Sequence, residues 1–190
     1  MSSSELVPPG TLLLAVPRML DPNFMHSVVL MVEHTPDGAY GLVLNRPSPL
    51  TLGQVLPDHP LLGNLALPVH FGGPVGREEA FHVLHRLPDT LDGGLELCEG
   101  VFLGADLDQL GEVLSAPGTE PEVRAILGYS GWGAGQLDDE LAAGSWLPAP
   151  PDAELVFGPL EPEDVWRRAM RSLGDMGQRL SQEPPDPSWN

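Results

Sequence analysis

The residues with the clearest potential for chemistry lie in the run Gly128–Gln136, GYSGWGAGQ, in which four glycines surround a tryptophan. The run stands between a strand-like segment and a helix-like one, where a glycine-rich turn could hold a phosphate. Its G-x-G-x-G spacing is not that of a dinucleotide-binding turn, and no Lys-Ser/Thr pair follows it. The acidic residues Asp138, Asp139 and Glu140 would also repel a phosphate from the first turn of the helix. We therefore interpret the run as a structural turn or a docking surface.

Trp132 and Ser130 are the side chains of this run that could bind or react. A tryptophan between two glycines has few neighbours to bury it, so an exposed Trp132 would be an anchor for a partner. The alternative is that Trp132 packs inward, since large aromatic side chains also dominate cores. Ser130 matches a nucleophile elbow only in part, because Trp132 stands where that motif requires glycine and no histidine partner is evident. We expect no catalytic residue here.

Arg46 is the side chain best suited to hold an anion. It lies in Asn45–Pro47, directly after a strand-like segment, which would place it at the end of a sheet. An arginine in a chain with excess acid usually forms an ion pair within the protein, and we expect one here, with a ligand carboxylate as the alternative. Gly72 and Gly73 end another strand-like segment. The candidate binding residues are therefore Asn45, Arg46, Gly72, Gly73, Ser130, Trp132 and Gln136.

Metal, redox and cofactor chemistry have little support in the sequence. Cys98 is the single cysteine, which excludes an intrachain disulfide and a cysteine-based zinc site. His82 and His85 are three residues apart on a predicted strand, so their side chains point to opposite faces and cannot chelate together. We expect neither a bound metal nor a cofactor.

The charge balance narrows the choice of partner. There are 27 acidic residues against nine basic ones, and the formal net charge is -18. Nucleic-acid binding rests mainly on lysine and arginine neutralising phosphates, and a chain this acidic repels a duplex at long range. No apolar run approaches the ~20 residues that a membrane helix needs, and we do not expect the N-terminal residues to act as a secretory signal. We expect a soluble, cytoplasmic protein that acts through protein partners, without direct binding to nucleic acid or membranes.

The elements that must position these residues are those of an α+β domain with one mixed sheet. We predict a single domain over residues 10–174, a flexible N-terminal arm over 1–9 and a disordered tail over 175–190. Apolar and β-branched patterns predict strands at 12–16, 27–34, 40–45, 69–71, 80–85, 95–102, 123–128, 146–147 and 155–157. Helical periodicity and capping residues predict helices at 50–56, 106–115, 136–143 and 161–173.

Several motifs give the chain a family resemblance. They are Met19-x-Asp-Pro-x-Phe24, Gly41–Pro47, Phe71–Pro74, Val83–His85, Gly128–Leu137 with Glu140, and Ser145–Leu147. In this order they resemble the AlgH/YqgE family of small bacterial proteins, over about residues 10–174. The resemblance implies that the mixed sheet curls into a partial barrel, and it implies no established enzyme activity or cofactor. One departure is Glu79-Ala80, where relatives tend to have Arg-Gly, so a role of that arginine would require Arg77 to substitute for it.

Three functions follow as hypotheses. The first is a non-catalytic binding or regulatory adaptor that holds a protein partner on the surface around Trp132 and Phe71–Pro74. The second is a small-ligand-binding protein or an enzyme with four candidates around one pocket, namely Asn45, Arg46, Ser130 and Gln136. The third is a transcriptional regulator, as some members of the family are labelled, although a net charge of -18 disfavours direct DNA binding. The sequence does not specify the partner, the pathway or the oligomeric state.

Overall fold

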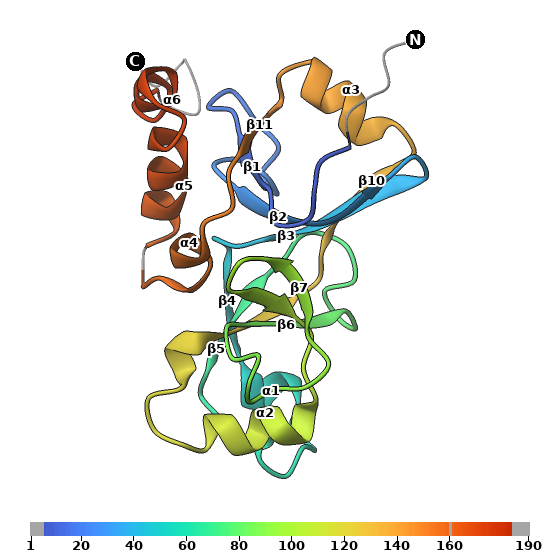
Figure 1. Cartoon of the computed structure of the whole chain (residues 1–190), viewed down its shortest axis with the longest axis vertical. Coiled ribbons are helices and arrows are strands. Elements are labelled where there is room, and N and C mark those ends of the chain that lie inside the picture. Colours follow the sequence, from blue (N-terminus) through green and yellow to red (C-terminus); the bar gives the residue numbers. More distant parts are fainter. Residues whose placement is uncertain (1–5, 160, 184–190) are drawn as a thin grey trace.

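The computed structural model describes residues 6–159 and 161–183, in which eleven strands form two sheets (Figure 1). The five-stranded sheet is antiparallel and contains, in spatial order, β10 (Ser130–Gly133), β3 (Gly38–Val43), β2 (Val28–Thr35), β1 (Leu12–Ala15) and β11 (Trp146–Ala149). The six-stranded sheet contains β4 (Pro47–Thr51), β5 (Pro68–Phe71), β9 (Val123–Leu127), β6 (Phe81–His85), β8 (Val101–Leu103) and β7 (Leu95–Cys98). It is mixed, because β5 and β9 run parallel. The predicted α+β class is confirmed, with the strands paired as two sheets.

The five-stranded sheet is covered on both faces, which explains the nearly continuous apolar sequence of β1 and β2. On one face, Leu14 and Leu30 belong to a core cluster with Trp166 of α5 (Pro162–Arg171). On the other face, Leu13 belongs to a second cluster with Leu137 of α3 (Gln136–Ala142). Figure 1 shows these two helices on opposite sides of the sheet.

The six-stranded sheet also has two apolar faces. Val83 and Ala125 form a third cluster with Leu110 of α2 (Leu107–Leu114), and α1 (Leu52–Val55) closes the same end of the molecule. From the opposite face, Leu84 and Ile126 enter the core cluster beneath the five-stranded sheet. The two sheets therefore share one core.

The remaining helices are α4 (Ala153–Phe157), α6 (Asp175–Leu180) and two short 3-10 turns, Leu62–Asn64 and Glu120–Glu122. Within the described ranges, no helix has the length and apolar character needed to cross a membrane.

Several local predictions are wrong. Residues 95–102 were expected to form one strand and instead form parts of β7 and β8, which pair antiparallel with each other. Residues 130–133 were interpreted as part of a turn and instead form β10. Residues 155–157 were expected to form a strand and instead lie in α4, because the Asp152 side chain accepts hydrogen bonds from the backbone N–H groups of Glu154 and Leu155 and so caps a helix. The strand predicted over 40–45 does end before Pro47, but Pro47–Thr51, where no strand was predicted, forms β4. This strand lies at the edge of its sheet, where a residue without a backbone N–H is tolerated.

The chain ends carry more structure than the sequence predicts. Residues 1–5 of the predicted arm lie outside the described residues, but Val7 is only 7% exposed and its N–H donates to Nδ1 of His34 at 2.9 Å. At the other end, α6 occupies part of the predicted tail. Gly177 packs against the carbonyl of Met170, so the absence of a side chain lets α6 approach α5 closely. Residues 184–190 of the tail lie outside the described residues.

The packing of Val7 gives a first prediction. Its side chain joins the cluster that includes Trp132 and Trp146. We expect Val7→Ala to lower the free energy of unfolding by about 1 kcal/mol, because buried methyl groups are lost. Leu6→Ala is the matched control, since Leu6 is 42% exposed and its truncation should cost little. Urea unfolding of both variants checks the prediction, and equal losses would contradict it.

Candidate binding site

Gly72 and Gly73 lie where the two sheets meet. The carbonyl of Gly72 accepts hydrogen bonds from the N–H of Val43 at 2.8 Å and from Oγ of Ser130 at 3.1 Å, and its N–H donates to Leu127 at 2.7 Å. Gly73 has a φ of +153°, and any β-carbon there would collide with the carbonyl of Tyr129. Glycine is therefore required for a close backbone approach at this junction. The candidates Gly72, Gly73 and Ser130 do come together, in a structural role.

Ser130 is fully buried, and its hydroxyl group is committed to the Gly72 carbonyl. Among the described residues, no histidine or other base is hydrogen-bonded to it. A serine nucleophile needs both access and a base within reach. Ser130 therefore supports the junction between the sheets and does not act as a nucleophile in this arrangement.

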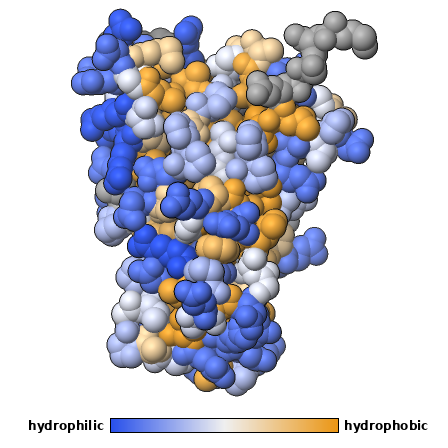
Figure 2. Space-filling view, in the orientation of Figure 1, coloured by the Kyte–Doolittle hydropathy of each residue, from blue (hydrophilic) through white to orange (hydrophobic). Residues whose placement is uncertain are grey.

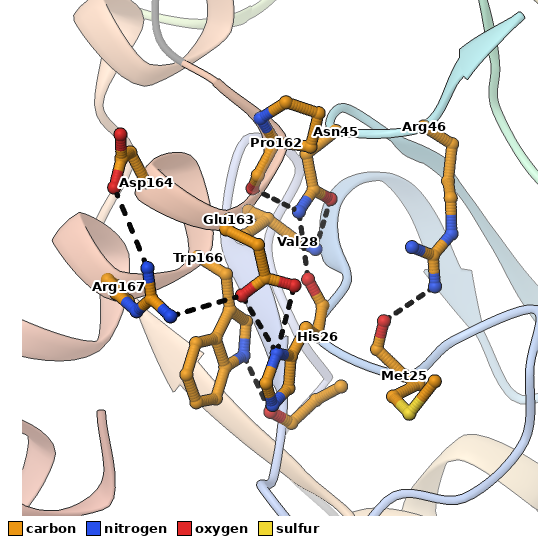
Figure 3. A network of polar contacts seen from close by, with 11 residues as sticks. Met25, His26, Val28, Asn45, Arg46, Pro162, Glu163, Asp164, Trp166 and Arg167 are labelled. Carbon is orange, nitrogen blue, oxygen red and sulfur yellow. Dashed lines mark hydrogen bonds and ion pairs between the residues drawn. The ribbon is translucent and has the colours of Figure 1, made fainter. Parts of the chain in front are cut away.

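Asn45 fastens helix α5 to the five-stranded sheet. Its Oδ1 accepts from the N–H of Val28 at 2.9 Å, and its Nδ2 donates to the carbonyls of His26 at 2.8 Å and Pro162 at 2.9 Å (Figure 3). The side chain is 3% exposed. Because one acceptor and both donors of the amide are used internally, Asn45 positions the site and does not face a ligand.

His26 shapes the turn that precedes β2. It has a φ of 53°, a conformation that costs a residue other than glycine about 1 kcal/mol or more. Its ring stacks on Trp166 with centroids 4.1 Å apart, and its Nδ1 lies 3.0 and 3.2 Å from the carboxylate oxygens of Glu163. These contacts offset the backbone strain. The turn then presents two successive carbonyls, that of Met25 toward Arg46 and that of His26 toward Asn45 (Figure 3).

Arg46 does not form the ion pair that we expected. Its Nη2 donates to the carbonyl of Met25, and more weakly to that of Pro22 at 3.4 Å. In the part of the chain that the structure describes, no carboxylate oxygen lies within 4.0 Å of this guanidinium. The expectation is wrong because a strained turn offers backbone carbonyls, which leave the positive charge of Arg46 without a paired carboxylate.

Arg77 is a second arginine at this site. Its Nε donates to the carbonyl of Gly73 at 2.8 Å, and its guanidinium lies over the Phe71 ring, 4.6 Å from the centroid. It too has no carboxylate within 4.0 Å among the described residues. Burial lowers the pKa of Arg46, the carboxylate of Glu163 raises it, and the positive charge of Arg77 lowers it. Arg46 and Arg77, the arginine pair, therefore share one electrostatic environment.

Arg77 and Glu163 were not among the candidates. Arg77 was considered only as a substitute for the arginine that relatives have near Glu79, because Glu78 and Glu79 suggest a solvated acidic segment. Glu163 lies in an acidic helix start, where it serves the helix dipole whether or not it has a partner. Its contact with His26 spans 137 positions and has no local signal in the sequence.

Trp132 and Gln136 belong to a separate cluster at the other end of β10. Trp132 is 7% exposed, so the expectation of an exposed binding anchor is wrong and the inward-packed alternative holds. Its Nε1 and that of Trp146 donate to one oxygen of Glu140, and Gln136 donates to the other oxygen. Oε1 of Gln136 accepts from the N–H of Gly133 at 3.0 Å. The glycine-rich run therefore builds a packing corner.

The contacts that the structure describes do not gather the seven candidate residues around one pocket. A cavity of about 510 Å³ opens between the segment around Pro17–Leu20 and the segment Ala143–Ser145, and none of the seven candidates lines it. Among the described residues, no group of three or more histidine, cysteine or carboxylate side chains is placed to hold a metal ion. Arg46, Gly72 and Gly73 remain at one place, together with Arg77 and Phe71.

Comparison with known proteins identifies the family of this chain. A family model described as AlgH-like matches residues 12–177. A protein from Chlorobium limicola is 38% identical over 96% of this chain and 95% of its own length, and one from Myxococcus xanthus is 45% identical over 87% and 90%; both are named only as UPF0301 proteins.

Two solved structures have a similar fold. The AlgH protein from Pseudomonas aeruginosa has a TM-score of 0.69 with 36% identity, and covers 91% of this chain and 92% of its own. A protein from Corynebacterium diphtheriae has a TM-score of 0.71 with 24% identity, over 93% of both chains, which supports the fold alone. The chain therefore belongs to the AlgH-like family.

Proposed function

We propose that this protein is a non-catalytic binding protein that recognises a protein partner through the arginine pair and the Phe71 ring. The observation that carries the proposal is that two arginines lack a carboxylate partner within 4.0 Å among the described residues, in a chain of net charge -18. An arginine in such a chain ordinarily finds an internal carboxylate. Leaving two of them unpaired at one place is typical of a surface that meets an anionic group of a partner.

The rigidity of the site supports recognition more than catalysis. The polar atoms of Asn45 and Ser130 are used in internal hydrogen bonds, and Arg77 is fixed by Phe71 and Gly73. The face of the molecule shown in Figure 2 has hydrophobic side chains interspersed with hydrophilic ones, not gathered into one broad patch. Specific charged groups, and not a large apolar surface, would then select the partner on such a surface.

Affinity capture from a nuclease-treated native lysate tests the proposal. The wild-type protein is compared with the double variant Arg46→Gln/Arg77→Gln and with Arg171→Gln, which removes one exposed arginine from α5. We expect a defined protein that wild type and Arg171→Gln retain equally and that the double variant retains at least tenfold less. Thermal unfolding of each variant controls for loss of fold. A lysate that yields no partner, or equal retention by all three proteins, would contradict the proposal.

A further inference from the structure

The geometry of the arginine pair points to a carboxylate-binding site, and we infer that the group it receives is a single carboxylate of a peptide segment. This inference rests on the proposed function, because it names the chemical group that the partner presents. It goes beyond that function in excluding phosphate as the preferred ligand. Three features of the site support it: the common direction of the two side chains, their remaining donors and the local charge.

The first feature is that both arginine side chains are directed to one face of the sheet. Arg46 faces Phe71 across the antiparallel pair β4 and β5, since the N–H of Phe71 donates to the Arg46 carbonyl at 2.8 Å and Pro47 pairs with His70. Residues directly opposite in such a pair direct their side chains to the same face. The guanidinium of Arg77 lies over the Phe71 ring on that face. The strand register therefore directs the Arg46 side chain to the face of the sheet on which Arg77 covers the Phe71 ring.

The second feature is the set of donors that remain. Nη2 of Arg46 is directed to backbone carbonyls, which leaves its Nε and Nη1 without an acceptor among the described residues. Arg77 uses Nε on the Gly73 carbonyl, which leaves the two terminal nitrogens of its planar fork. Two parallel N–H groups of a guanidinium match the two oxygens of a carboxylate. The internal bonds hold both side chains in place, so little conformational entropy is lost on binding.

The third feature is the local charge. The pair carries two positive charges, and Glu163 is close enough to raise the pKa of Arg46 while its carboxylate is engaged by His26. Arg167 lies 3.8 Å from Glu163 and 3.8 Å from Asp164, so these two neighbours add one positive and one negative charge. The sum of the five groups is therefore one positive charge, which matches a monoanion. The remaining charge of the chain is strongly negative and repels a dianion more than a monoanion. A carboxylate therefore suits the site better than a phosphate.

An NMR titration with sodium acetate, at constant ionic strength, tests the inference directly. The NMR signals of the arginine Nε–Hε groups report on the site. The Nε–Hε group of Arg77 donates a hydrogen bond to the Gly73 carbonyl. We expect acetate to shift the Arg77 signal and the amide signals of Phe71 and Gly73 in a saturable manner. In Arg77→Gln the affinity should fall at least tenfold, while Arg171→Gln should bind like wild type. Arg46→Gln, with its thermal unfolding measured, is a second variant because Arg46 also supports the turn at Met25.

Inorganic phosphate and short peptides provide the remaining arms. Three results would each overturn the inference. Phosphate could bind more tightly than acetate, the acetate-induced shifts could persist in Arg77→Gln, or those shifts could fail to saturate. A peptide with a free C-terminus, its amide, and an amidated peptide with an internal glutamate show whether the α-carboxylate or a side chain is the source. If a partner is captured through the arginine pair but acetate does not bind, the carboxylate inference fails and the proposed function stands. If acetate binds but no partner is captured, the proposed function fails and the carboxylate inference stands.

Discussion

Replacing Glu140 with alanine is expected to lower the free energy of unfolding by about 3 kcal/mol, because two buried indole N–H groups would lose their shared acceptor. Nε1 of Trp132 and Nε1 of Trp146 donate to Oε2 of Glu140 at 2.9 and 2.8 Å, and Gln136 donates to Oε1 at 2.9 Å. The two tryptophans are 7% and 2% exposed, so water cannot readily replace the carboxylate. Chemical unfolding at pH 7, followed by tryptophan fluorescence, measures the loss.

Glu140→Gln is the matched variant for this prediction. Its amide oxygen can face the two indoles and keep both hydrogen bonds, while its NH₂ group then meets the donor of Gln136. We therefore expect a loss of about 1 kcal/mol, well below that of Glu140→Ala. Equal losses in the two variants would show that the negative charge, and not the acceptor, stabilises this corner. A loss below about 1 kcal/mol in Glu140→Ala would contradict the structural role itself.

The glycine-rich corner shows how far the sequence could be interpreted. The strand before it and the helix after it were predicted, because apolar runs and capping residues act locally. The direction of Trp132 was not, since it depends on Glu140 reaching two indoles, one of them on β11. Alternation alone allows the tryptophan to face either way. An acceptor that is shared by donors from two different strands leaves no pattern in a single sequence.

The division of the strands into two sheets could not be predicted either, because it also depends on contacts between segments that are far apart in the sequence. The hairpin of β2 and β3 is joined by a turn whose residues favour tight reversal, so its pairing could be predicted. The parallel pairing of β5 with β9 joins Val69 to Ala125 and depends on the whole intervening chain. Nothing in either segment specifies that partner. Local elements were therefore predictable, and the assembly of the six-stranded sheet was not.

The sequence identified Arg46 as a candidate binding residue but did not predict its contacts. Arg46 was identified because it follows a strand and because cations are scarce in this chain. Its hydrogen bonds to backbone carbonyls could not be predicted, since carbonyls occur at every position and give no signal in the sequence. The strained φ of His26, which directs the Met25 carbonyl toward Arg46, is likewise a property of the folded chain. The site was located by residue type, and its unpaired charge became visible only in three dimensions.

Acidification to pH 5 is expected to destabilise the protein by about 2 kcal/mol through His70 alone. The ring is largely buried, and its Nε2 lies 3.3 Å from Nη1 of Arg124, which must donate, so this nitrogen accepts in the neutral form. Burial and the charge of Arg124 lower the pKa of His70 to about 4. In the unfolded chain the pKa returns to about 6.5. Between these values the unfolded state binds more protons, so stability is present above pH 6.5 and is lost as the pH falls.

His70→Gln isolates this contribution, because a glutamine amide can accept from Arg124 but does not titrate in this range. The difference in unfolding free energy between pH 8 and pH 5 should be smaller in His70→Gln than in wild type by about 2 kcal/mol. His82 and His85, whose pKa values burial also lowers, are present in both chains and cancel in the comparison. Equal pH dependence in the two proteins would contradict the prediction.

Arg124→Met tests the cause of the low pKa. Burial also lowers the pKa of Arg124 itself, and its acceptors are neutral: His70, the Leu44 carbonyl at 3.5 Å and the Gly158 carbonyl at 3.3 Å. Removing its positive charge should raise the pKa of His70, because only burial then opposes protonation. The acid sensitivity should accordingly lie between those of wild type and His70→Gln. NMR titration of the His70 ring reports the pKa directly, and an unchanged value in Arg124→Met would assign the whole effect to burial.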